Sequence, residues 1–62
     1  MNTDLKIRTK IILLDYLAVL QADKKDLNNR DYSEFNEQLK VYNQQDINKV
    51  EKLINDLNKP IS

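Results

Sequence analysis

The sequence predicts an all-α fold, a small bundle of three helices that is completed by dimerisation. Two features of composition point to helices: the 62 residues contain no glycine, and the one proline is Pro60. Hairpin turns and phosphate-binding loops commonly need a positive φ, which glycine adopts most readily. The third feature is the helical spacing of apolar residues along the chain. We therefore expect a single helical domain over residues 1–62.

Composition also argues against several kinds of functional site. The chain has no cysteine and no histidine, so disulfides, Cys/His zinc sites and His-activated nucleophiles are excluded. Ten basic and ten acidic residues cancel, and no block of like charge suggests a nucleic-acid-binding arm. We expect no catalytic residue, no metal and no cofactor, and hence a protein that is not an enzyme.

The apolar run at residues 11–20 is too short to span a bilayer, and it contains Asp15. The start of the chain is a poor match to a secretory signal, because Asp4 dilutes its positive charge. We expect a soluble, cytoplasmic protein without a membrane partner.

The first expected helix has Asn2 or Thr3 as its N-cap, followed by an acidic residue that suits the helix dipole. At about 100° per residue, its apolar residues form three stripes that cover most of the circumference. The first stripe is Ile7, Ile11, Leu14 and Ala18; the second is Leu13, Leu17 and Leu20; the third is Leu5, Ile12, Tyr16 and Val19.

A narrow polar strip occupies the remaining side of this helix and consists of Asp4, Arg8 and Asp15, followed by Ala22. We expect Asp15 to be solvated near Arg8. The alternative is a buried carboxylate that fixes helix register, which would be costly without a partner.

The second expected helix follows a polar segment at residues 21–31, where the first helix is expected to fray. Asp31 and Glu34 match a capping box, with Asp31 as the N-cap. The aromatic and apolar residues that follow lie at spacings of a single helix face, which we expect to pack in the core: Tyr32, Phe35, Leu39 and Tyr42.

The last segment carries Ile47, Val50, Ile54 and Leu57 on one face, with Leu53 alongside. A cap within residues 43–46 would make this a third helix. The alternative is a helical hairpin with one long second helix. The apolar spacing keeps its helical phase through residues 43–46 in that case, but Asp46 then lies on the apolar face. Three helices are favoured, because burying Asp46 unpaired would cost several kcal/mol.

A first helix that is apolar almost all round needs more cover than two one-sided helices can give. We expect the first stripe to face the core of the same chain and the third stripe to contact a second chain, while the second stripe could face either. The candidate interface residues are Leu5, Ile12, Leu13, Tyr16, Val19 and Leu20.

These observations favour a small protein–protein interaction module, a regulator, inhibitor or adaptor that acts as a homodimer. Two alternatives stay open. One is a nucleic-acid-binding helical dimer that uses the basic residues Lys6, Arg8 and Lys10. The other is a structural subunit of a larger assembly. The balanced net charge disfavours the nucleic-acid binder.

The first prediction concerns cofactors. Because the chain lacks thiolate, imidazole and glycine-rich phosphate-binding elements, Zn²⁺ or a nucleotide should leave its melting temperature unchanged. Thermal unfolding followed by circular dichroism, with and without each ligand, measures this. A large upward shift would reveal a binding site that the sequence does not suggest.

Overall fold

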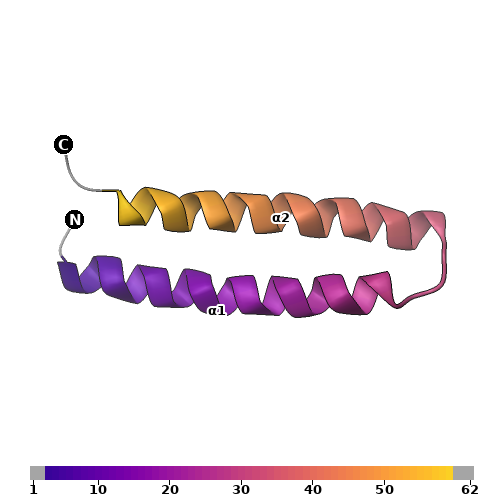
Figure 1. Ribbon diagram of the computed structural model, residues 1–62, viewed down its shortest axis with the longest axis horizontal. Coiled ribbons are helices and arrows are strands. Elements are labelled where there is room, and N and C mark those ends of the chain that lie inside the picture. The colour runs from indigo at the N-terminus through magenta and orange to yellow at the C-terminus, as the bar shows by residue number, and fades with distance from the viewer. Residues whose placement is uncertain (1–2, 60–62) are drawn as a thin grey trace.

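The computed structural model describes residues 3–59, which form two helices and no strand. Helix α1 spans Thr3–Asn28 and α2 spans Glu34–Asn58. The helices lie side by side and antiparallel, so that the start of α1 and the end of α2 share one end of a rod 46 Å long (Figure 1). The all-α prediction is confirmed, and the architecture is the helical hairpin rather than the three-helix bundle.

Two expected breaks in the chain are absent from the structure. Helix α1 continues through the polar segment up to Asn28, and α2 continues through residues 43–46 without a new cap. Both segments lack glycine and proline, so the backbone hydrogen bonds of each helix continue without interruption. The expected cap at Asn2 lies outside the described residues.

The turn between the helices occupies residues 29–33, a length typical of a helical hairpin. No residue among 3–59 has a positive φ, so this turn needs no glycine. The end of α1 tightens instead: the backbone N–H of Asn29 donates to the Asp26 carbonyl (3.1 Å), and that of Arg30 to the Leu27 carbonyl (3.3 Å). Such i→i+3 bonds use carbonyls that a helix end would otherwise leave unpaired.

The N-cap of α2 is Ser33, and the prediction of Asp31 was wrong. The Ser33 hydroxyl accepts a hydrogen bond from the Asn36 backbone N–H at 3.0 Å. The Asn36 side-chain amide donates to the Asp31 backbone carbonyl at 2.9 Å. With Glu34 and Glu37, the first turn of α2 also carries two acidic residues that suit the helix dipole.

The core lies between the second stripe of α1 and one face of α2. Leu20 packs with Ile47, Val50 and Ile54, while Leu13 and Leu17 are partly buried against them. Along α1, Leu13, Leu17, Leu20 and Leu27 lie inward at spacings of four, three and seven residues. Along α2, spacings of four and three residues alternate from Asn43 to Leu57. This is the repeat of a coiled coil, here formed by the two arms of one chain.

Asn43 is the one polar residue buried in the described part of this interface, at 8% exposure. Its side-chain amide donates to the Leu20 backbone carbonyl of α1 at 3.0 Å. Asp46 lies on the edge of the interface and is partly exposed. The continuous helix therefore buries the neutral, hydrogen-bonded amide of Asn43 and leaves the Asp46 carboxylate partly in solvent, where its charge is not costly.

The second prediction follows from the cap. Ser33→Ala should lower the free energy of unfolding by about 1 kcal/mol, because it removes the oxygen that accepts from the Asn36 N–H. Asp31→Ala is the matched control and should change it by less than about 0.5 kcal/mol. Urea unfolding of both variants measures the difference, and a larger loss for Asp31→Ala would restore Asp31 as the cap.

Candidate functional site

Residues 3–59 contain no group of three or more His, Cys, Asp or Glu side chains arranged to hold a metal ion. The basic N-terminal residues are partly engaged: Arg8 pairs with Asp4 at 3.2 Å, and the Lys10 ammonium donates to the Asn58 side-chain oxygen at 2.7 Å. These contacts reduce the charge available to a phosphate backbone.

The first stripe of α1 does not face the core, which corrects the expectation from sequence. Ile7, Ile11 and Leu14 are 54%, 53% and 45% exposed, and Ala18 is exposed as well. In the hairpin α1 has one neighbouring helix, α2, and the second stripe packs against it. The chain therefore covers one stripe rather than two.

The third stripe is also uncovered. Ile12 is 67% exposed, and Leu5, Tyr16 and Val19 are about half exposed. These four were named as interface candidates, and each is open to contact from outside the chain. The other two candidates, Leu13 and Leu20, already pack against α2, and Leu20 is only 5% exposed.

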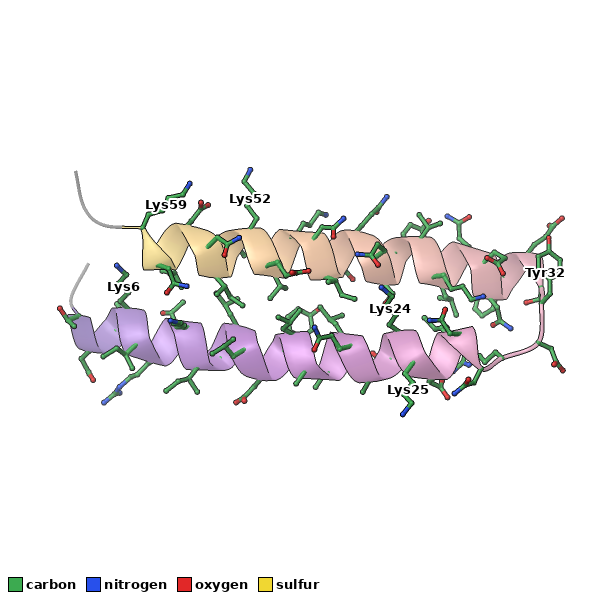
Figure 2. All side chains as sticks on the ribbon, viewed as in Figure 1. Lys6, Lys24, Lys25, Tyr32, Lys52 and Lys59 are labelled. Atoms are coloured by element: carbon green, nitrogen blue, oxygen red, sulfur yellow. The ribbon has the colours of Figure 1, made fainter. Side chains whose placement is uncertain are left out.

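The aromatic residues near the turn are exposed too, so the expectation that they pack in the core was wrong. Tyr32, Phe35 and Tyr42 are all open to solvent, and only Leu39 of that group is partly buried. Figure 2 shows Tyr32 at the turn, beyond the paired lengths of the two helices. The cause is the rotation of α2 that brings Asn43 and Ile47 inward and carries Phe35 and Tyr42 outward.

The third stripe shares its side of the hairpin with the outward apolar residues of α2. A pocket of about 360 Å³ is lined by Asp23 of α1 and by Tyr42 and Asp46 of α2, among others. Along α1, Asp23 continues the third stripe after Val19 at a helical spacing. Along α2, Phe35 and Leu53 lie one heptad from Tyr42 and Asp46 respectively, and so face the same side.

We call this surface the two-helix face. It consists of Leu5, Ile12, Tyr16 and Val19 from α1 and of Phe35, Tyr42 and Leu53 from α2. Sequence analysis placed Phe35 and Tyr42 in the core. Apolar residues at spacings of three and four define two adjacent faces of α2, and either could pack on α1. The face that packs inward is the one that carries Asn43, whose buried amide bonds to α1.

The other side of the hairpin is apolar on α1 and polar on α2. Here the Lys24 ammonium donates to the Gln44 side-chain oxygen at 2.9 Å, as Lys10 does to Asn58 farther along. Figure 2 shows Lys24 in the space between the helices, whereas Lys25 and Lys52 point away from it. The first stripe borders this polar side and is only one helix wide.

A carboxylate cluster lies in the half of the two-helix face that is nearer the turn. Asp23 and Asp46 line the pocket, and Asp26 does so while paired with Arg30 at 2.8 Å. Neither Asp23 nor Asp46 has an ion-pair partner within residues 3–59. Asp23 and Asp46 therefore lie between the apolar residues nearer the chain ends and Phe35, which is in the first turn of α2.

Neither helix of the described chain is long and apolar enough to cross a membrane. No protein-family model, curated protein or solved structure matches this chain.

The third prediction compares the stripes. Leu17→Lys should unfold much of the hairpin, because it places an ammonium in the contact between the helices. Ile11→Lys should retain the helicity of the unmodified chain, because residue 11 is already half exposed. Circular dichroism at 222 nm measures both. A greater loss for Ile11→Lys would mean that the first stripe is the one facing α2.

Proposed function

We propose that this protein is a small non-enzymatic interaction module, a regulator, inhibitor or adaptor, that acts as a homodimer through the two-helix face. The observation that carries the proposal is the exposure of two of the three apolar stripes of α1. In the described chain, twelve large hydrophobic residues are exposed, against five hydrophobic residues that are buried. Contiguous apolar surface of this kind is typical of protein interaction sites.

The accessible surface supports the same proposal. The chain exposes 5098 Å², whereas a compact monomer of this mass would expose about 4,200 Å². The excess of about 900 Å² is close to the roughly 800 Å² that each partner contributes to a standard interface. One protein partner of ordinary size would bring the chain to the exposure of a compact protein.

A second copy is the partner that we favour. The chain has zero net charge, so two copies meet without overall repulsion. Two-fold dimers are the commonest oligomers, and a hairpin is a natural half of a four-helix bundle. A core this small also gains from association, since few domains of this length are stable without added support.

The first stripe favours a second candidate, a subunit of a larger assembly. A dimer that packs through the two-helix face leaves Ile7, Ile11 and Leu14 exposed on its flank. If another protein covers this stripe, the homodimer is an adaptor. If further copies of the same chain cover it, the homodimer is a subunit of a larger assembly.

The fourth prediction tests self-association. Sedimentation equilibrium at micromolar concentration should give the mass of two chains. The double variant Ile12→Lys with Val19→Lys should sediment as one chain, because two ammonium groups would have to be desolvated in the interface. Its helicity should fall less than that of Leu17→Lys, because Ile12 and Val19 are more than half exposed whereas Leu17 packs against the core.

A matched control is Ile11→Lys with Ala18→Lys, which adds the same charge to the first stripe. This control should remain a dimer. A wild-type monomer at that concentration would refute the homodimer, and a mass above two chains that the control variant reduces to two would favour the larger assembly.

A further inference from the structure

We propose that the two copies pack their two-helix faces together about a two-fold axis near Tyr16, with their hairpin turns at opposite ends. This arrangement rests on the proposed function, since it presupposes a homodimer. Three features of the molecule point to it: the width of the face, the level of each residue along the rod and the position of the unpaired charges.

The two-helix face is the wider of the two apolar surfaces. It draws exposed apolar residues from both helices, whereas the first stripe lies beside the polar side of α2. Packing face to face therefore brings all four helices into contact, as in a four-helix bundle. Packing through the first stripe would join the copies along one helix each.

The levels of residues along the rod follow from two contacts between the helices. The Asn43 amide bonds to the Leu20 carbonyl, and the Lys10 ammonium bonds to Asn58. Because the helices are antiparallel with equal rise per residue, Tyr16 lies level with about residue 49 of α2. Ile12 then lies near the level of Leu53, and Val19 near that of Asp46.

Two symmetric arrangements bring the faces together. With the axis parallel to the helices, both turns lie at one end and α1 packs on α2 of the partner. Asp23 and Asp46 of both copies would then gather at one level of the interface, unpaired. Four carboxylates in one place repel one another, which disfavours this arrangement.

With the axis perpendicular to the helices, α1 packs antiparallel on α1 of the partner. An axis near Tyr16 sets Ile12 within one residue of the level of Val19 of the partner subunit, and Asp23 within one residue of the level of Arg8 of the partner subunit. On α2 the same axis sets Asp46 within a turn of Lys49 of the partner subunit. Asp46 thus comes near a lysine, and Asp23 comes near an arginine that already pairs with Asp4 of its own chain. The Asp23 side chains of the two copies lie about 20 Å apart along the rod, since residue 23 is seven residues from the axis.

Tyr16 lies at the centre of this interface. Its ring contributes apolar contact area, and its hydroxyl can remain hydrated or bond across the axis. Aromatic residues near the centre of an interface commonly contribute much of its binding energy. The structure leaves this ring about half exposed in one chain.

The test uses single cysteines, which are unambiguous because the chain has none of its own. Under mild oxidation, Tyr16→Cys should form a disulfide-linked dimer at least tenfold faster than two matched controls on the same helix. The controls are Ala18→Cys on the first stripe and Ala22→Cys on the polar strip. A disulfide requires the two Cα atoms to lie within about 7 Å, which only a residue near the axis satisfies.

A second measurement leaves Tyr16 intact. A spin label on Asn29→Cys, at the turn, should report a distance of about 40 Å between the two copies, since residue 29 lies about 20 Å along the helix from the axis. A distance of 20 Å or less would place both turns at one end and overturn the arrangement. Fastest cross-linking of Ala18→Cys would place the interface on the first stripe and also overturn it.

These outcomes separate the two proposals. A monomeric mass refutes the homodimer itself, and the arrangement falls with it. A dimeric mass combined with a short label distance, or with cross-linking through Ala18→Cys, refutes only the arrangement.

Discussion

The rotation of α2 about its own axis is the constraint on which the rest of this hairpin depends. Its 3,4 apolar spacing allows two neighbouring faces to pack on α1, one with Asn43 inside and the other with Asp46 inside. The amide of Asn43 bonds to the Leu20 carbonyl, so the first choice buries a neutral and satisfied group. The second would bury a carboxylate without a partner, at a cost of several kcal/mol.

This rotation also decides what the molecule presents to its surroundings. Turning Ile47, Val50 and Ile54 inward moves Phe35, Tyr42 and Leu53 outward, to the side where α1 exposes its third stripe. The apolar residues that the rejected packing would have used in the core therefore form half of the two-helix face. The hydrogen bond between the Asn43 amide and the Leu20 carbonyl thus fixes which face of α2 is inside, and so which apolar residues are exposed.

The sequence was sufficient for the helical class, for the apolar face from Ile47 to Leu57 and for the exposure of Asp15. It was insufficient where two helix faces fit one pattern: Tyr42 and Asn43 are neighbours, and spacing alone does not say which turns inward. It also failed at the caps, because Asp31 and Ser33 are both good N-cap residues. Ile12, Tyr16 and Val19 were candidates because two one-sided helices could not cover three stripes. The structure leaves them exposed because α2 packs on the second stripe.

In the proposed homodimer, folding and association are coupled. The buried cluster of Leu20, Ile47, Val50 and Ile54 gives α1 and α2 one line of contact, and an isolated hairpin of this size has little net stability. A partner that binds only the folded hairpin adds its binding energy to that stability, so stability should depend on concentration. In the proposed homodimer the apolar excess of α1 would be part of the fold, since the residues that one chain leaves exposed would complete the core that the two chains share.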